Sequence, residues 1–210
     1  MSAIDYISCV NWLLVSLAAV LLLSCEKAGE AQLFTISVEA PGLIQTRSAD
    51  PPDESTISDL NLFVFSEDGF LEEFRYLSSR TLEKNGGRIS IQVPLVRGIR
   101  ASIACCANFG YEIKGISTLK ELSAYRYNLA YPDEYSRGIP MSALVTKVWS
   151  TDDDSVTIPL ERMMAKISVS MDRSALDNGV RLSVKGVTIG NCPRSASVIG
   201  PSSVQGALDV

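Results

Sequence analysis

Short runs of alternating apolar and polar residues recur between residues 33 and 191, and turn-forming residues separate them. In residues 33–40 (LFTISVEA), Phe34, Ile36 and Val38 fall on one face and mostly polar residues on the other. This two-residue period is typical of a β-strand with one buried face. Because the runs are short and closely spaced, the pattern predicts an all-β chain folded as an antiparallel β-sandwich.

Turn-forming residues show where the predicted strands connect. Asp68-Gly69 predicts a hairpin within residues 57–78, and the sequence KNGGR (84–88) predicts another turn. The other runs predicted as strands are residues 88–98, 99–110, 139–149, 156–172 and 180–191.

One run has a helical period instead. In residues 117–130, Ser117 or Thr118 can cap a helix whose first turn contains Glu121, and apolar residues follow at helical spacing. The sequence therefore predicts one short helix inserted into the β-sandwich.

The longest apolar run, residues 10–23, carries no charge and ends just before Cys25. At about fourteen residues it is shorter than the roughly 20 of a membrane-spanning helix, but it fits the apolar core of a signal peptide. Residues 22–25 (LLSC) resemble the lipobox of bacterial lipoproteins, which predicts lipidation of Cys25 and a firm anchor of two or three acyl chains. The alternative is an ordinary secretory leader that contains a cysteine. Residues 1–10 carry Asp5 and no Lys or Arg, which is unusual for any leader.

The charge and composition exclude several classes of function. The chain has 210 residues, a formal net charge of −5 and no histidine. A chain with an excess of acidic residues offers no basic face for phosphates, so a nucleic-acid partner is excluded. Without histidine, the Ser-His and Cys-His nucleophile pairs and the usual zinc sites cannot form. The sequence therefore predicts a protein that is not an enzyme and uses no metal or other cofactor.

Three cysteines follow the leader, and no C-x-x-C pair occurs among them. Cys105 and Cys106 fall in a predicted strand, one facing inward and one outward. A disulfide from either of them to Cys192 is an open alternative without support from the spacing. All three thiols are therefore predicted to be free.

Three sets of polar residues suggest chemistry, and each has a simpler explanation. Residues 152–154 (DDD) could hold calcium, but the rest of the EF-hand pattern is missing, so a solvated turn is the preferred interpretation. Glu72 and Glu73 make a poor catalytic pair, because neighbours on a strand face opposite sides. Four tyrosines could form a carbohydrate platform, although core packing and loop anchoring are favoured: Tyr125, Tyr127, Tyr131 and Tyr135.

The segment after the first predicted strand, residues 41–56, contains three prolines and many small polar residues. Exposed loops of this length and composition are where proteases cut folded domains. Arg47 is the only basic residue in this loop. An arginine-specific protease would therefore have a single place to cut, although an ordinary surface arginine is the alternative.

Several motifs, in one order along the chain, resemble the fimbrillins, which are type V pilus subunits of gut and oral anaerobes. The most specific is in residues 156–171, with Leu160, Arg162, Ala165 and Lys166 in the family's places. The resemblance extends from residue 20 to about residue 190. The motifs are LLSC (22–25), a first strand followed by Thr46-Arg47, ISDLNLFVFSEDGFL (57–71), ASIACCANFG (101–110), IPMSA (139–143) and VTIPLERMMAKISVSM (156–171).

This resemblance implies a precursor built from transthyretin-like β-sandwich domains, exported as a lipoprotein to the outer membrane and cell surface. It implies cleavage after an arginine, here Arg47, and removal of the first strand. A strand donated by another fimbrial subunit, from the C-terminus in the family, then fills the exposed groove by strand addition. The implied function is that of a structural or tip subunit of an adhesive fimbria. The alternative is a lipid-anchored surface module that binds a glycan or host protein without polymerising.

The resemblance also divides the chain. Residues 1–24 are expected to be the signal peptide, and residues 25–56 the lipidated N-terminus with the first strand and the cleavable loop. Residues 57–172 are expected to complete the β-sandwich. Residues 173–210 are expected to be its last strand or strands, or the start of a truncated second β domain.

Overall fold

The structure is a computed structural model of the chain. It describes residues 31–41, 55–82, 87–128, 138–150, 155–164, 167, 169–177, 179–200 and 204–205. Within these residues, no helix has the length and apolar character that crossing a bilayer requires.

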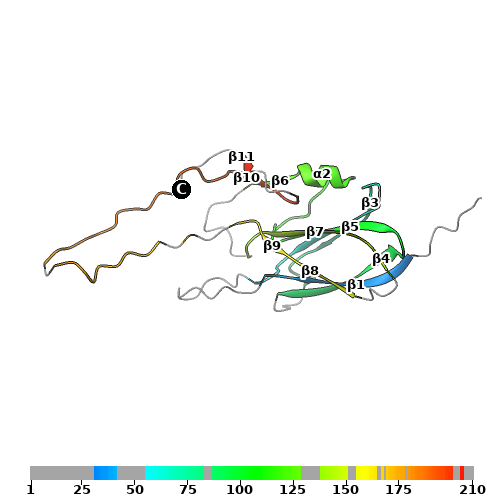
Figure 1. The fold of residues 1–210 in the computed structure, drawn as a ribbon, viewed down its shortest axis with the longest axis horizontal. Helices are drawn as coiled ribbons and strands as arrows, with labels where there is room; N and C mark the ends of the chain where they lie inside the picture. The colour runs from blue at the N-terminus through cyan, green and yellow to red at the C-terminus, as the bar shows by residue number, and fades with distance from the viewer. Residues whose placement is uncertain are drawn as a thin grey trace, which may run out of the picture.

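One layer of the sandwich is a three-stranded sheet in the order β4-β1-β8 (Figure 1). The central strand, β1 (Ala31–Glu39), runs antiparallel to β4 (Arg88–Val96) and parallel to β8 (Ser155–Pro159). The predicted first strand is therefore confirmed, and the β1–β8 pair is the exception to an otherwise antiparallel fold. β8 joins this sheet by crossing over from the other layer, where its predecessor β7 lies.

The other layer is a five-stranded antiparallel sheet in the order β3-β2-β5-β7-β9. The predicted hairpin is confirmed, and Gly69 in its turn has a φ of +80°, a conformation that favours glycine. The strands are β2 (Leu60–Phe65), β3 (Leu71–Leu77), β5 (Arg100–Ala107), β7 (Met141–Val148) and β9 (Glu161–Arg162).

The strands β2 and β5 of the five-stranded sheet are buried on both faces. One face packs on the three-stranded sheet, and the other is covered by the helix α2 (Leu119–Ala124) and a small sheet in the order β11-β10-β6. This explains why Cys105 and Cys106 are both buried although they point to opposite faces. The strands of the small sheet are β6 (Arg126–Asn128), β10 (Ser195–Ser197) and β11 (Val204–Gln205).

The prediction of the helix is correct for its N-terminal cap, but the predicted helix extends too far at the C-terminal end. Thr118 accepts a hydrogen bond from the Glu121 backbone, and the Glu121 carboxylate accepts one from the Thr118 backbone, which is a capping box. The helix ends at Ala124, because the next residues form β6 and pair with β10. Pairing with a distant strand thus overrides the helical spacing of residues 126–128.

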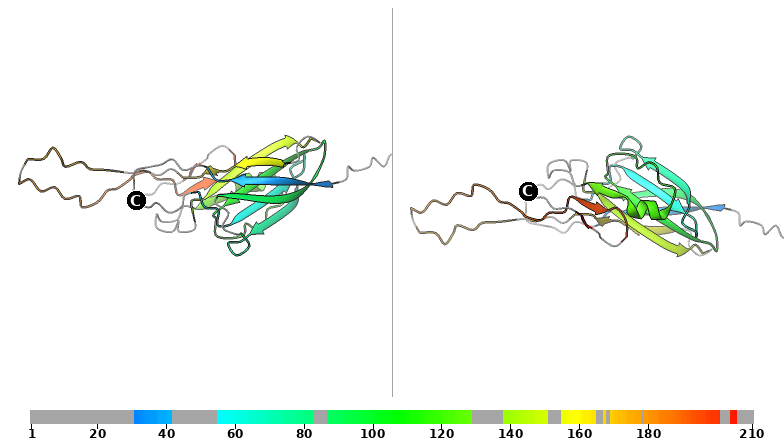
Figure 2. Two further views of the ribbon diagram at one scale, coloured as in Figure 1. Left: turned by 90° about the horizontal axis from the view of Figure 1, so that it is seen from below. Right: turned by 90° about the horizontal axis from the view of Figure 1, so that it is seen from above.

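A long arm leaves the sandwich after β9. Figures 1 and 2 show it as the yellow-to-orange segment that extends along the long axis of the molecule and returns to β10. The described residues of the arm, between 167 and 190, belong to no strand, although residues 156–172 and 180–191 were predicted as strands. Only β8 and β9 form within the first of these ranges, so the prediction is wrong for the arm. For the described residues, the all-β sandwich with one short helix is confirmed.

Candidate functional site

The position of β1 distinguishes it from every other strand of the sandwich. It lies between β4 and β8, and neither of these strands has another partner among the described strands. Its pairing with β4 runs from Ala31 opposite Val96 to Glu39 opposite Arg88. Removal of β1 would therefore separate β4 from β8 and leave two unpaired sheet edges facing one another.

The inner face of β1 is part of the main core. Phe34, Ile36 and Val38 are almost completely buried, with exposed fractions of 2%, 0% and 0%. The Phe34 ring packs edge-on against the ring of Trp149 at 5.8 Å between centroids, and the Arg97 guanidinium lies over the Phe34 ring, 5.7 Å from its centroid. The alternating pattern thus predicted the buried face correctly. The groove beneath β1 is lined by apolar side chains of both sheets.

The outer face of β1 interacts with β4 through polar side chains. The hydroxyls of Ser37 and Ser90 lie 3.3 Å apart. Two residues further along β1, the Glu39 carboxylate forms an ion pair with Arg88. Directly opposite residues on paired strands contact each other in this way, so the two pairs report the register of the strands.

At the end of β1, backbone hydrogen bonds join it to both neighbours. The Ala40 N–H donates to the Gly87 carbonyl at 2.8 Å, and the Leu160 N–H donates to the Glu39 carbonyl at 2.7 Å. These bonds come from the segments that lead into β4 and out of β8. The backbone of a replacement strand would have to supply the same acceptors and donors.

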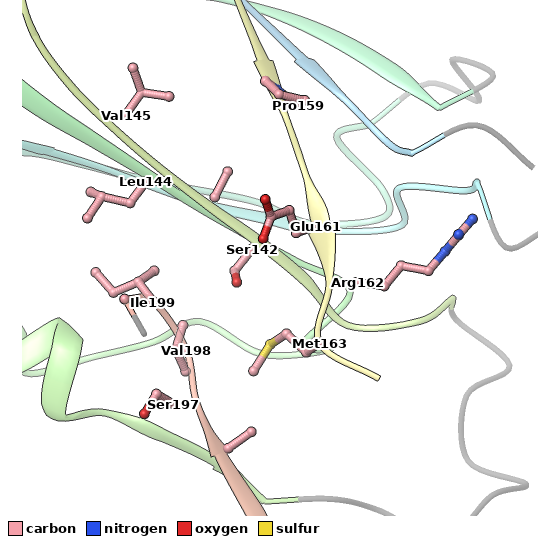
Figure 3. Close-up of a pocket in the computed structure, with 13 residues that line it drawn as sticks. Ser142, Leu144, Val145, Pro159, Glu161, Arg162, Met163, Ser197, Val198 and Ile199 are labelled. Atoms are coloured by element: carbon pink, nitrogen blue, oxygen red, sulfur yellow. The ribbon is translucent and has the colours of Figure 1, made fainter. Parts of the chain in front are cut away.

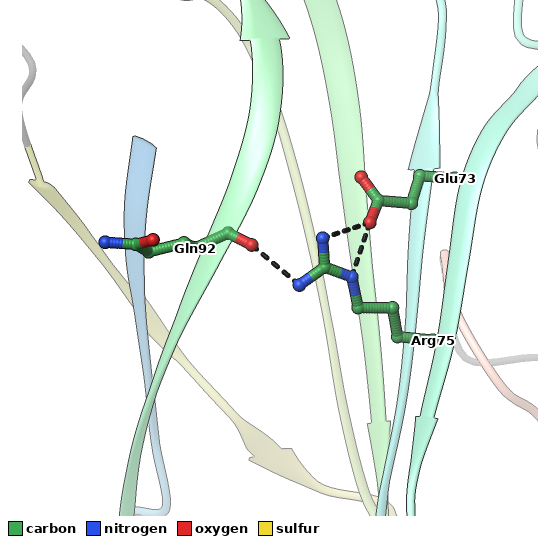
Figure 4. A network of polar contacts seen from close by, with 3 residues as sticks. All are labelled: Glu73, Arg75 and Gln92. Atoms are coloured by element: carbon green, nitrogen blue, oxygen red, sulfur yellow. Dashed lines mark hydrogen bonds and ion pairs between the residues drawn. The ribbon is translucent and has the colours of Figure 1, made fainter. Parts of the chain in front are cut away.

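Besides its apolar side chains in the core, β4 makes a polar contact with the other sheet that does not involve β1. Arg75 of β3 donates a hydrogen bond to the Gln92 carbonyl of β4 at 2.8 Å and forms an ion pair with Glu73 (Figure 4). The Gln92 carbonyl lies on the edge of β4 that faces away from β1, because Arg75 approaches from β3. β4 therefore keeps a polar attachment to the five-stranded sheet if β1 is removed.

The position of β8 in the sandwich depends on β1 more than the position of β4 does. Its backbone pairs with β1 from Thr35 opposite Ser155 to Glu39 opposite Pro159. Within β8, only Ile158 is fully buried in the core. Without β1, this strand would keep its place mainly through that one side chain and the adjoining Leu160.

The segment that follows the predicted cleavage loop is fastened by Asn108, a residue that the sequence analysis did not single out. The Asn108 amide donates to the Thr56 carbonyl at 2.8 Å and to the Ile139 carbonyl at 2.9 Å, and its oxygen accepts from the Ser58 N–H at 2.7 Å. Gly138 must be a glycine here, because its φ is +103° and a Cβ would come within 2.5 Å of Asn108 Nδ2. Residues 56–58 therefore stay attached to the sandwich independently of β1.

A hollow of about 500 Å³ lies where β9 covers only the first residues of β7. Apolar side chains such as Leu144, Met163 and Val198 form much of its wall (Figure 3). Its charged lining residues are Glu161 and Arg162, and Figure 3 shows the Arg162 side chain directed away from the hollow. A lone carboxylate beside apolar walls supplies no acid–base pair and no nucleophile.

The thiols are free, as the sequence predicted. Burial raises the pKa of the Cys105 thiol to about 12, and burial followed by the neighbouring Cys105 raises the pKa of Cys106. A thiol becomes a nucleophile only as a thiolate, so these two are unreactive at neutral pH. Cys192 is half-buried at the base of the arm.

The tyrosines do not form a platform in the described part of the chain. Tyr127 is buried and packs on Phe109 at 4.8 Å between ring centroids, so core packing is confirmed for it. The Tyr125 hydroxyl donates to that of Tyr111 at 3.5 Å, and burial together with this hydrogen bond raises the pKa of Tyr111. Tyr131 and Tyr135 lie outside the described residues.

Other predicted sites also fall outside the described residues. Cys25 and Arg47 are among them, although the ends of the loop that contains Arg47 are described at Pro41 and Ser55. Residues 152–154 are likewise not described. Among the side chains that the structure does place, no three His, Cys, Asp or Glu residues gather into a metal-binding group.

The fold is similar to that of solved fimbrial proteins. A fimbrial assembly protein from Parabacteroides distasonis ATCC 8503 superposes with a TM-score of 0.55 and 14% identity, over 85% of this chain and 72% of that protein. A fimbrilin (fimA) from Porphyromonas gingivalis W83 superposes with a TM-score of 0.52 and 18% identity, over 81% of this chain and 53% of that protein. This chain thus spans about half the length of the fimbrilin. No protein-family profile matches the sequence, and no curated protein does. The predicted resemblance to fimbrillins is confirmed at the level of the fold.

Proposed function

We propose that this chain is a structural or tip subunit of a cell-surface fimbria that serves adhesion. In this proposal a protease removes β1, and a strand from another subunit takes its place between β4 and β8. The observation that carries the proposal is that β1 is the central strand of its sheet. The similarity in fold to a fimbrial assembly protein and a fimbrilin agrees with it. Chemistry on a substrate has no part in this function.

The energetics favour exchange over simple loss of the strand. Each of the three buried side chains of β1 contributes about 1.5–3 kcal/mol by leaving water. Their sum is comparable with the net stability of a whole domain, which is about 5–15 kcal/mol. A subunit without β1 would therefore be marginally stable alone, with unpaired backbone groups along both edges of an apolar groove. An incoming strand that satisfies these groups stabilises the subunit and links it to its neighbour.

The proposed route to the surface uses the two residues that the sequence singled out. The chain is exported by its leader and lipidated at Cys25, which anchors it in the outer membrane until processing. Cleavage after Arg47 then separates the anchor and β1 from the rest of the subunit. Metabolic labelling with a palmitate analogue tests the first step, because a Cys25→Ala protein should take up no label. Equal labelling of both proteins would contradict lipidation at this residue.

The cleavage step is tested by treating the folded precursor with an arginine-specific protease. Arg47 should be cut first, and the cut protein should form polymers that survive SDS without boiling. Arg47→Ala should block both the cut and the polymers. Arg80→Ala is the matched control, because Arg80 is another exposed loop arginine; this variant should be cut and should polymerise like the wild type.

Polymers that form at the normal rate from the Arg47→Ala protein would contradict this maturation route. In that case the non-polymerising, lipid-anchored module that binds a glycan or host protein would be the better description of the chain.

A further inference from the structure

On one side of the sandwich, the edge strands of the two large sheets lie next to each other. β3 ends the five-stranded sheet and β4 ends the three-stranded sheet, and neither has a strand partner beyond its edge among the described strands. Unpaired edges are where copies of a β-protein tend to join. We infer that Glu73, Arg75 and Pro94 block this side, and prevent β4 from pairing with β4 of a second copy. The proposed function concerns the opposite edge of β4, so the inference does not depend on it.

The residues of β4 alternate in the direction of their backbone groups. The Gly87 carbonyl accepts from the Ala40 N–H, so Gly87 and every second residue after it face β1. The backbone groups of the intervening residues, which include Gln92 and Pro94, therefore point to the outer edge. The hydrogen bond from Arg75 to the Gln92 carbonyl agrees with this assignment, because Arg75 belongs to β3.

Two positions on the outer edge of β4 are closed to an added strand. Pro94 has no N–H, so it offers no donor where a ladder of hydrogen bonds needs one. Two residues before it, the Gln92 carbonyl already accepts a hydrogen bond from the Arg75 guanidinium at 2.8 Å (Figure 4). A strand added to β4 would lack a bond at Pro94 and would have to displace Arg75 from Gln92.

The charged residues at the edge of β3 point into the sandwich. Glu73 lies opposite Val64 and Arg75 lies opposite Leu62, and both of these partners are buried in the main core. Directly opposite residues on paired strands face the same side, so the ion pair of Glu73 with Arg75 lies between the two sheets. Within the described part of the chain, the buried Oε2 atom of Glu73 has no hydrogen-bond partner.

This ion pair makes an added strand costly. The pair keeps contact with water through the open side, since 37% of the Arg75 side chain and 20% of the Glu73 side chain are exposed. A strand laid along this side would remove that water. Charged groups that lose water without gaining a partner destabilise the structure that buries them. Inward-pointing charges and proline on edge strands are two of the features that keep β-proteins from joining edge to edge.

Without these three residues, the side would suit the addition of a strand. β4 is nine residues long, and its buried and exposed positions alternate almost to its end. A long, regular edge of this kind is a template for another strand. A second copy is the natural partner because it carries the same edge, and two antiparallel β4 strands related by a two-fold axis offer each other identical groups.

Substitutions that open the edge test the inference in the full, uncut chain. Pro94→Thr restores the missing N–H at an exposed position. Glu73→Val and Arg75→Thr are made together, so that no lone charge is left between the sheets. In sedimentation velocity the wild type should be monomeric. The triple variant should self-associate, with an association constant at least tenfold higher than that of the wild type.

The matched control removes the same two kinds of charge from exposed positions. It carries Glu72→Val and Arg80→Thr, and both residues are exposed to solvent. Its association constant should stay within about twofold of that of the wild type. Hydrogen exchange then locates the contact. In the triple variant the outward N–H groups of Ser90 and Gln92 should exchange at least tenfold more slowly than in the wild type, and in the control they should not change.

Several results would overturn the inference. A triple variant that stays monomeric is one, and association without slower exchange at Ser90 and Gln92 is another. A control that associates as strongly as the triple variant would show that loss of charge alone explains the effect. A wild-type protein that already pairs through β4 would contradict the block directly.

A single substitution keeps the test decisive if the triple variant does not fold. Pro94→Thr changes one exposed residue, so this protein should keep the wild-type unfolding midpoint. Its association with slower exchange at Gln92 would support the inference, and its remaining as monomeric as the wild type would overturn it. All of these measurements use uncut protein, so their results do not depend on cleavage at Arg47 or on the formation of polymers.

Discussion

β1 and residues 167–172 of the arm (ISVSMD) have nearly the same pattern of side chains and opposite environments. The apolar residues of β1 are buried between two sheets, whereas Ile167, Val169 and Met171 are more than half exposed. The strands that flank β1 come from far along the chain, at residues 88–96 and 155–159. The arm has no such neighbours among the described residues. Alternation therefore shows which segments can be strands, and the partners decide which of them become strands.

The difference also separates two roles for the same pattern. In the sandwich, alternation stabilises the folded subunit. In the arm, the same alternation leaves apolar side chains exposed, where they contribute little to the stability of the sandwich. The free energy of a substitution in each region should show this contrast.

The largest effect is expected from a matched pair of truncations in the uncut protein. Ile36→Ala leaves a cavity beneath β1, and should lower the free energy of unfolding by about 2–5 kcal/mol. Leu182→Ala in the arm should change it by no more than about 0.5 kcal/mol, because that side chain is 45% exposed. Urea unfolding followed by tryptophan fluorescence measures both, since Trp149 lies against β1.

A large loss for Leu182→Ala would show that the arm is already packed within one subunit. The contrast between the two regions would then disappear.

The sequence predicted those features of the sandwich that depend on local pattern. The strand at residues 33–40, the hairpin at Gly69 and the cap at Thr118 all follow from neighbouring residues, and all are present. The direction of pairing between β1 and β8 could not be predicted, because the residues of an alternating strand do not encode which partner it will meet. For the same reason the arm was predicted as strands.

The sequence analysis also missed the second covered face of the five-stranded sheet. Asp59 and Asn61 occupy polar positions of an alternating run, which predicts exposure to solvent. Both are instead buried beneath the loop that leads to the helix. Asn61 accepts from the Ile113 N–H at 2.9 Å, and Asp59 accepts from the Gly110 N–H at 2.9 Å. Buried polar groups need such partners, but the partners lie about fifty residues away in the sequence.

The next largest effect compares two asparagines in the left-handed conformation. Asn108, with φ of 63°, lies in the sandwich, and Asn191, with φ of 59°, lies at the base of the arm. Glycine tolerates this backbone in both places, so substitution isolates the role of the side chain. Asn108→Gly removes three hydrogen bonds and should cost about 1.5–4.5 kcal/mol, at about 0.5–1.5 kcal/mol for each bond.

Asn191→Gly should change the free energy of unfolding by less than about 0.5 kcal/mol, because Asn191 is exposed. Equal losses for the two variants would mean that the base of the arm is as tightly held as the loops of the sandwich. Limited digestion with a protease of broad specificity offers a second measurement. In the Asn108→Gly protein, cleavage should extend into residues 56–58, which Asn108 holds in the wild type.

The smallest expected effect is a change of stability with pH. It depends on the exclusion of water from the core of the sandwich, whereas the arm is exposed to water. Burial raises the pKa of Cys105 from 9.0 to about 12, so the thiol stays protonated in the folded protein at a pH where it ionises in the unfolded chain. The folded state then binds more protons than the unfolded state, and stability must fall as pH rises. The contribution is complete below pH 9 and is lost progressively as the pH approaches about 12. Between pH 8 and pH 10, the wild type should lose about 1 kcal/mol more than a Cys105→Ala protein, since one pKa unit corresponds to about 1.4 kcal/mol. The difference between the two proteins cancels the titration of lysines and tyrosines that both share. Parallel losses over this pH range would indicate that water reaches Cys105, and that the groove beneath β1 is already open before any cut.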